Sequence, residues 1–152
     1  MKALLHEVKD SSDCDGEIPN QIDEYMIEKC LGIGASGSVY LAVREGSERR
    51  VAVKLMHAVI DQESRAKRAW RELELLEQLH LPGFPHVYDY GLDHGRLFIV
   101  SDYVAGKPLL RYCLDHDLDG EARVRLLIKV ARKLQTLHEH GVIHRDLKPS
   151  NV

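Results

Sequence analysis

The chain has 152 residues, of which 44% are apolar and 30% are charged, a composition typical of one globular domain with its own core. The net charge of −3 and the isoelectric point near 6.3 do not indicate a general affinity for nucleic acid or anionic membranes. No apolar run reaches the roughly 18 residues of a membrane span, and the three cysteines include no Cys-x-x-Cys pair typical of zinc sites. We therefore expect a cytoplasmic location, no nucleic acid partner and no membrane segment within this chain.

The first part of the chain is predicted to form a sheet. Residues 1–23 are polar and contain several Asp, Ser and Gly residues, which predicts a flexible leader. Five β-prone runs follow, separated by turn residues. Between the third and the fourth run, apolar residues recur every three or four positions, as in an amphipathic helix. The expected strands cover residues 25–31, 38–44, 50–56, 87–92 and 96–103, and the expected helix covers residues 64–80.

The last part of the chain is predicted to be helical. Residues 109–114 have the pattern of a short helix, and residues 121–140 have the apolar stripe of a long one, which ends at Gly141. Strands that are grouped before helices favour an α+β fold over a doubly wound parallel sheet.

A glycine-rich segment, Gly32-Ile33-Gly34-Ala35-Ser36-Gly37-Ser38-Val39, lies between the first two predicted strands. Glycines allow backbone N–H groups to approach phosphate oxygens without interference from a Cβ atom. The dinucleotide-binding fingerprint requires a helix after its glycines, whereas a β-prone run follows here. The context therefore favours a phosphate-covering flap between two strands, with a plain glycine-rich hairpin as the alternative.

Lys54 ends the apolar run Val51-Ala52-Val53 on the next predicted strand. Because lysine avoids burial unless it is paired, its ammonium group is predicted to contact the phosphates of a nucleotide under the flap. The alternative is an edge lysine that points to water. An acidic partner is expected on the 64–80 helix. Glu72 is preferred because it lies beside the inward apolar stripe, and Glu74 is its rival.

The most specific motif is His144-Arg145-Asp146-Leu147-Lys148-Pro149-Ser150-Asn151, which follows the long predicted helix. With the glycine-rich segment and Lys54, in this order and at these spacings, it resembles the eukaryotic-like serine/threonine protein kinase family. The resemblance implies a five-stranded antiparallel sheet with one inserted helix, followed by the first helices of a helical lobe. The partial kinase domain is expected at 24–152, with its N-terminal lobe at about 24–103, its hinge at about 102–107 and the start of its C-terminal lobe at 108–152.

The same resemblance implies a site for ATP between the sheet and the hinge. Val39 and Ala52 would pack against the adenine, and the carbonyl of Asp102 and the amide of Val104 would bind its edge. Lys54 would hold the α- and β-phosphates. The residues expected to bind the nucleotide are Gly32, Ile33, Gly34, Gly37, Val39, Ala52, Lys54, Glu72, Asp102 and Val104.

The resemblance also assigns catalytic roles. Asp146 would accept the proton of the substrate hydroxyl, and Lys148 would stabilise charge on the transferred phosphoryl group. Asn151 would supply an oxygen ligand to Mg²⁺, a hard cation that prefers such ligands. A lysine at position 148 is typical of kinases specific for serine and threonine. The implied function is ATP- and Mg²⁺-dependent phosphorylation of Ser and Thr hydroxyls on a protein substrate.

The sequence departs from the family in lacking the activation loop, the Ala-Pro-Glu region and the rest of the helical lobe. The Asp-Phe-Gly motif, whose aspartate binds the principal Mg²⁺ in the family, does not occur in these 152 residues. A group that stabilises transition-state charge is commonly worth about 10²–10³ in rate. We therefore expect a domain truncated before this motif, with negligible activity on its own. The alternatives are a nucleotide-binding or scaffold module without catalysis, and a small-molecule phosphotransferase with the same core.

Overall fold

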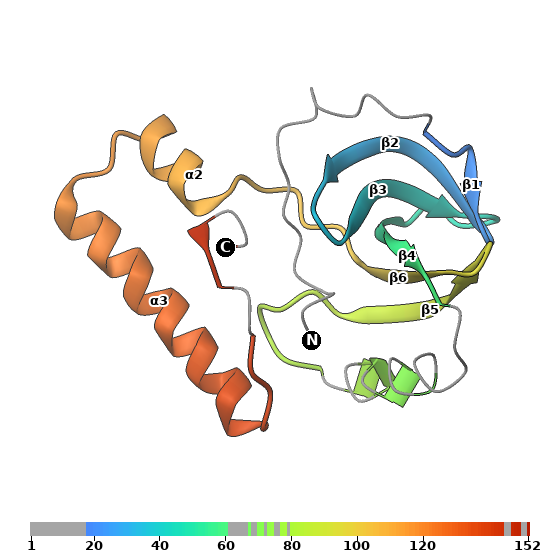
Figure 1. The fold of residues 1–152 in the computed structure, drawn as a ribbon. Coiled ribbons are helices and arrows are strands. Elements are labelled where there is room, and N and C mark those ends of the chain that lie inside the picture. Colours follow the sequence, from blue (N-terminus) through green and yellow to red (C-terminus); the bar gives the residue numbers. More distant parts are fainter. Residues whose placement is uncertain are drawn as a thin grey trace.

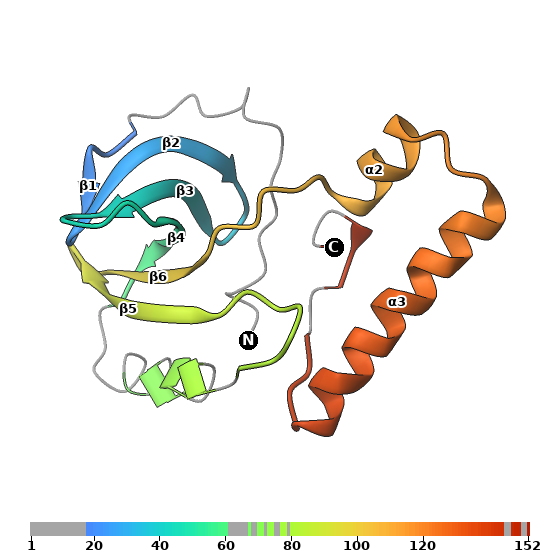
Figure 2. The same cartoon turned by 180° about the vertical axis from the view of Figure 1, so that it is seen from behind.

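The computed structural model describes residues 18–60, 67, 70–71, 73–74, 77–78, 80–144, 147–149 and 152. They form an antiparallel sheet followed by two helices (Figures 1 and 2). The sheet has six strands in the order β1-β2-β3-β4-β6-β5. The strands are β1 (Gln21–Ile22), β2 (Tyr25–Ile33), β3 (Gly37–Arg44), β4 (Arg50–Val59), β5 (Val87–Asp93) and β6 (Arg96–Asp102), and the helices are α2 (Leu109–Asp115) and α3 (Gly120–Glu139).

The α+β class and the order of the elements are confirmed. The five expected strands correspond to β2–β6, and described residues between β4 and β5, such as Trp70 and Leu73, are helical. The sheet has one strand more than expected, because β1 pairs with β2 through Ile22 and Tyr25. This strand lies within the leader expected at 1–23. Two residues are too few to produce a recognisable alternation of apolar and polar positions.

The hairpin between β5 and β6 follows from its turn residues. Asp93 pairs with Arg96, and the two residues between them have positive φ angles, 46° at His94 and 76° at Gly95. A two-residue loop with both φ angles positive is the turn that matches the twist of an antiparallel pair. The residues Asp93-His94-Gly95 therefore suit this turn, since Gly95 adopts a positive φ angle without steric cost.

Strand alternation divides the core into two clusters. On β6, Phe98 and Val100 belong to a cluster enclosed by the curved sheet, whereas Leu97 and Ile99 belong to a second cluster. The second cluster also contains Leu73 from the helical segment that follows β4. Figure 1 shows helical residues of this segment (green) beside β5. Successive side chains of a strand point to opposite faces, so both faces of β6 are covered.

The same alternation turns Ala52 and Lys54 away from the enclosed cluster, because Val51, Val53 and Leu55 occupy it. Lys54 is paired in register with Val39 on β3 and with Ile99 on β6. Lys54 therefore lies between Val39 on one side and Ile99, a member of the cluster that includes Leu73, on the other. This face of the sheet carries the candidate site.

The helix α3 has well-defined ends, but several of its apolar side chains are not packed against other described residues. The Asp119 side chain caps its first turn by accepting a hydrogen bond of 2.7 Å from the Ala122 amide. At the other end, the Val142 amide donates to the Leu137 carbonyl, after Gly141 with φ of 72°. Leu137 is buried, whereas Val124, Leu127 and Ile128 on the same helix are exposed. Within the described part of the chain, no helix is long and apolar enough to cross a membrane.

Candidate functional site

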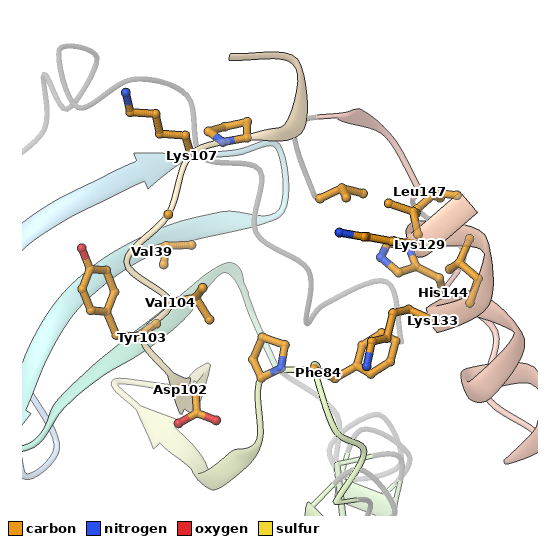
Figure 3. A pocket seen from close by; sticks show the side chains of 18 of the residues that line it. Val39, Phe84, Asp102, Tyr103, Val104, Lys107, Lys129, Lys133, His144 and Leu147 are labelled. Atoms are coloured by element: carbon orange, nitrogen blue, oxygen red, sulfur yellow. The ribbon is translucent and has the colours of Figure 1, made fainter. Parts of the chain in front are cut away.

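A pocket of about 500 Å³ lies between the sheet, the segment that leaves β6, and α3 (Figure 3). This volume is within the range of about 300–1,000 Å³ that small-molecule sites occupy. Its wall is mainly apolar, with three lysines, one histidine and one aspartate. The residues that line it are Leu31, Val39, Ala52, Gly83, Phe84, Pro85, Asp102, Tyr103, Val104, Gly106, Lys107, Pro108, Lys129, Val130, Lys133, Leu134, His144, Leu147 and Val152.

The sheet contributes Leu31, Val39 and Ala52 to this wall. Val39 and Ala52 come from adjacent strands, on the face opposite the enclosed cluster. Leu31 lies where the pairing of β2 with β3 shifts register between Cys30 and Gly32. A bulge of this kind changes which side chains face which side of a sheet. The three apolar side chains form a surface on which a flat ring could pack.

The segment between β6 and α2, here called the linker, covers residues 103–108 and forms another part of the wall. Tyr103, Val104, Gly106, Lys107 and Pro108 all line the pocket. The Val104 side chain is 65% exposed, although large apolar side chains are usually covered in a folded domain. An apolar ligand in the pocket would cover it.

The glycine-rich segment forms a tight turn between β2 and β3. The Gly34 amide donates to the Gly37 carbonyl at 2.9 Å, and the Ser36 carbonyl accepts from the His57 amide at 3.1 Å. Ser38 Oγ and His57 Nε2 are 3.1 Å apart. A Cβ atom at Gly37 would collide with the carbonyl oxygen of Leu55, so only glycine allows this approach of β3 to β4. The flap is thus held against the end of β4.

Lys54 is buried, with 4% of its surface exposed. It projects from β4 on the same face as Ala52, opposite Val51 and Val53, which belong to the enclosed cluster. Its predicted partner Glu72 lies outside the described residues, so the pairing stays a prediction. The rival Glu74 is exposed, as a residue on the solvated face of that helix would be.

The residues after α3 bring part of the predicted catalytic loop to the pocket. His144 is buried, and His144 and Leu147 line the wall opposite the sheet (Figure 3). Lys148 is described but is not part of the pocket wall. Asp146 and Asn151 lie outside the described residues. Their predicted roles in proton transfer and Mg²⁺ binding therefore remain predictions.

The α3 side of the pocket carries positive charge. Lys129 and Lys133 line it with Val130 and Leu134. The ammonium group of Lys133 donates to the Pro82 carbonyl at 2.7 Å. This bond joins α3 to the turn that precedes β5. The turn also supplies Phe84 and Pro85, next to Lys133 in the pocket wall.

The carboxylate of Asp102 is held by three groups. The His86 amide donates to it at 2.9 Å, the Tyr88 hydroxyl at 2.5 Å and the Arg49 guanidinium at 3.0 Å. Burial by itself would raise the pKa of Asp102, but the hydrogen bonds from Tyr88 and His86 and the charge of Arg49 lower the pKa overall. Asp102 is therefore ionised at neutral pH, and it fixes the point where the chain leaves the sheet.

Four of the predicted nucleotide-binding residues meet in the pocket wall, namely Val39, Ala52, Asp102 and Val104. Gly32, Gly34, Gly37 and Lys54 lie on the neighbouring strands and turn without forming part of the wall. Ile33 packs against the enclosed cluster, and Leu31 lines the pocket.

Sequence reasoning missed Leu31, Phe84 and Pro85. Leu31 is adjacent to the glycine-rich segment, but its orientation depends on the register shift, which no pattern in the sequence reveals. The Leu81-Pro82-Gly83 turn indicates the end of a helix, and it carries no signal that the next residues face a pocket.

The apolar side chains of Val39, Ala52 and Val104 line the pocket together and could accept a flat ring, with the other linker residues beside them. Within the ranges that the structure describes, no group of three or more His, Cys, Asp or Glu side chains could hold a metal ion. The predicted Mg²⁺ ligand Asn151 is not among those residues.

Comparison with known proteins agrees with this geometry. The model of the protein kinase domain family matches residues 25–152. The chain is 32% identical over 129 residues to the serine/threonine-protein kinase pkn2 of Myxococcus xanthus, covering 84% of this chain and 16% of that protein. It is 34% identical over 132 residues to pkn3 of the same organism, covering 85% of this chain and 24% of that protein.

Solved structures show the same likeness. The kinase domain of Mycobacterium tuberculosis PknI superposes with a TM-score of 0.72 at 29% identity, over 90% of this chain and 57% of that one. The chain thus spans under a quarter of the length of pkn2 and pkn3, and somewhat more than half of the PknI kinase domain. On the family match and these likenesses, the chain belongs to the protein kinase family.

Proposed function

We propose that this chain forms the nucleotide-binding part of a serine/threonine protein kinase that transfers a phosphoryl group from ATP to Ser and Thr hydroxyls of a protein. The observation that carries the proposal is the pocket beside the linker, with Val39, Ala52 and Val104 in its wall. The buried Lys54 projects from the same face of the same sheet. An apolar slot beside a buried cation suits a ligand with an aromatic ring at one end and negative charge at the other.

In this proposal, each part of the site has one task. Val39 and Ala52 hold the adenine ring by apolar contact, and the linker backbone at Asp102 and Val104 binds its edge. The glycine-rich segment covers the phosphates with backbone N–H groups. Lys54, oriented by Glu72, compensates the charge of the α- and β-phosphates. The bound ATP and Mg²⁺ supply the transferred group and the metal charge.

The catalytic loop would carry out the transfer. Asp146 accepts the proton of the substrate hydroxyl while the hydroxyl oxygen forms its bond to the γ-phosphorus and the bond to ADP breaks. Lys148 stabilises the negative charge on the phosphoryl group, and Asn151 contributes to Mg²⁺ binding. Specificity for Ser and Thr is supported by Lys148 and by the relatives, which are named serine/threonine kinases. Because ATP is a cytoplasmic cosubstrate, the proposal includes a cytoplasmic site of action.

A second candidate is a nucleotide-binding or scaffold module without catalysis. This module would use the same pocket wall, with Val39, Ala52 and Val104, and would differ from the first candidate only in lacking transfer. Both candidates assign nucleotide binding to these residues, and we expect negligible transfer by them alone. Transfer is to be measured in the whole protein, because the relatives pkn2 and pkn3 are several times longer than these 152 residues.

Nucleotide binding is tested by thermal unfolding with and without Mg-ATP. Ligand at about 100 times its Kd stabilises the folded state by about 2.7 kcal/mol, so the wild type should melt at a clearly higher temperature with Mg-ATP. Lys54→Met should lose most of this shift. Lys29→Met is the matched control, because Lys29 is exposed on β2 and outside the pocket wall. Equal shifts in all three proteins would contradict the role of Lys54.

Catalysis is tested by incubating the whole protein with a mixed protein substrate and γ-labelled ATP, followed by identification of the phosphorylated amino acids. We expect label on Ser and Thr that disappears with Asp146→Asn. Nucleotide binding without transfer would favour the scaffold module. Transfer to a small molecule, with no label on protein, would favour the phosphotransferase.

A further inference from the structure

Four side chains meet behind the pocket, where β6 ends and the linker begins. They are Arg49, His86, Tyr88 and Asp102, here called the Asp102 network. Arg49 precedes β4, His86 precedes β5, Tyr88 lies on β5 and Asp102 is the last residue of β6. Three chain segments that are far apart in the sequence thus converge on one carboxylate. None of the predicted phosphate-binding or catalytic residues belongs to the network.

The contacts within the network are mutual. The guanidinium of Arg49 lies over the Tyr88 ring, with its carbon 4.3 Å from the ring centroid, and it also donates to the Tyr88 hydroxyl. A cation over an aromatic face is attracted by the ring quadrupole. The Tyr88 ring meets the His86 ring edge-on at 4.8 Å between centroids. Arg49 and Tyr88 therefore support each other while both bind Asp102.

Asp102 is bonded to His86 through its own backbone amide and through its side chain. Its amide donates to the His86 carbonyl at 3.0 Å, and its carboxylate accepts from the His86 amide at 2.9 Å. These two bonds close a ring between the end of β6 and the start of β5. In Figure 3 the Asp102 carboxylate points away from Val39 and Val104. The side chain thus anchors the residue from behind, and the pocket wall continues directly into Tyr103 and Val104.

We infer that the Asp102 carboxylate, held by Arg49, Tyr88 and the His86 amide, is a positioning group that orients the linker backbone and thereby sets the preference for adenine over guanine. The inference rests on the proposed function, because it deepens the role of the same pocket. Adenine presents an N–H donor beside a ring-nitrogen acceptor, and guanine presents an acceptor beside a donor. A linker peptide that is fixed in one orientation matches one of these patterns and opposes the other.

A nearby ion pair provides a matched control. Arg50 Nε binds Glu28 at 2.9 Å, with side-chain exposures of 62% and 36%. Arg49 binds Asp102 at 3.0 Å, with exposures of 60% and 34%. Exposed pairs of this kind contribute little to stability, so both should matter equally little to folding. Neither Arg50 nor Glu28 lines the pocket, so only the Arg49 pair should affect the nucleotide.

The test measures the affinity of the protein for Mg-ATP and Mg-GTP by calorimetry, together with the urea midpoint of each variant. Outer partners of ligand-binding groups are commonly worth about tenfold in affinity, as is known for the partners of metal ligands. We expect Asp102→Ala to weaken ATP binding by about tenfold and to reduce the ratio of ATP to GTP affinity. Tyr88→Phe and Arg49→Gln should reduce the ratio by about two- to fivefold, within the range expected for single exposed contacts.

The control variant Arg50→Gln should leave the ratio unchanged at a similar urea midpoint. A role in stability alone would lower the midpoint of Asp102→Ala without changing the ratio of ATP to GTP affinity, and this result would overturn the inference. If Asp102→Ala does not fold, Tyr88→Phe decides, because it removes one hydroxyl and keeps the ring. A wild type that binds neither nucleotide would refute the proposed function itself, which separates the two failures.

Discussion

The sheet and the helices after it differ in how their apolar residues are covered. Phe98 and Val100 in the middle of β6 are almost completely buried, and each face of that strand has its own cluster. On α3, by contrast, Leu127 is 56% exposed, and Val124 and Ile128 are exposed beside it. Both regions have regular secondary structure with well-formed ends. They differ in what covers the apolar side chains.

This difference shows that an apolar sequence pattern specifies which face of a strand or helix is apolar, but not which other element packs against that face. A sheet of six strands curves and encloses its own cluster, so its alternation is sufficient to build a core. A single helix cannot enclose its stripe and depends on other elements for packing. We therefore expect the sheet to carry most of the free energy of unfolding of the described residues and α3 to carry little.

The largest predicted effect compares Phe98→Ala with Leu127→Ala. Phe98 is 1% exposed in the enclosed cluster, and truncating a buried Phe typically costs about 3–5 kcal/mol. Leu127 is exposed on α3, where substitutions usually change stability by about 0.5 kcal/mol or less. Urea denaturation followed by circular dichroism measures both. Similar losses for the two variants would show that α3 is packed as tightly as the sheet.

An intermediate effect is expected from two glycine substitutions that should change the free energy of unfolding in opposite directions. Gly37→Ala should destabilise by about 1–3 kcal/mol, because the added Cβ atom would meet the Leu55 carbonyl oxygen. Gly120 in the first turn of α3 has open space around it and no positive φ angle, so Gly120→Ala should stabilise by about 0.4–1 kcal/mol. The same denaturation experiment checks both signs, and a stabilising Gly37→Ala would contradict the close packing of β3 on β4.

A smaller effect concerns alkaline pH. Tyr25 is buried and donates to Asp89 at 2.8 Å, and burial followed by this bond raises the pKa of Tyr25. A pKa that is higher in the folded than in the unfolded state gives stabilisation that is complete below the unfolded value of about 10 and is lost as the pH rises beyond it.

The measurement is the urea midpoint between pH 8 and pH 11. We expect the midpoint of the wild type to fall more steeply above pH 10 than that of Tyr25→Phe. At pH 8 the variant should be less stable by about 1 kcal/mol, since one hydrogen bond is lost. Parallel curves for the two proteins would mean that Tyr25 ionises as easily in the folded protein as in the unfolded chain.

Most of the fold could be predicted from the sequence, because its signals are local. β-prone runs separated by turn residues predicted β2–β6. The strand β1 could not be predicted, because the burial of Ile22 depends on pairing with β2. Two residues are also too few to show an alternation of apolar and polar positions.

A motif and strand alternation together indicate one face of the sheet for Val39, Ala52 and Lys54, and Val39 and Ala52 line the pocket on that face. Leu31 lines the pocket and Ile33 packs against the enclosed cluster because the pairing of β2 with β3 shifts register. The Asp102 network depends on a sheet order that brings Arg49, Tyr88 and Asp102 together. Such contacts between distant positions leave no trace in a single sequence. Glu72, Asp146 and Asn151 lie outside the described residues, so their roles rest on the family resemblance.

The central claim is that the pocket between the sheet and the linker is the nucleotide site. The most direct test is an NMR titration of the isotope-labelled protein with a non-hydrolysable ATP analogue and Mg²⁺. The account predicts changes in the amide signals of Val39, Ala52 and Val104 and none at Val124 or Leu127 on the exposed face of α3. Changes confined to α3, or no changes at ligand concentrations that saturate protein kinases, would contradict it.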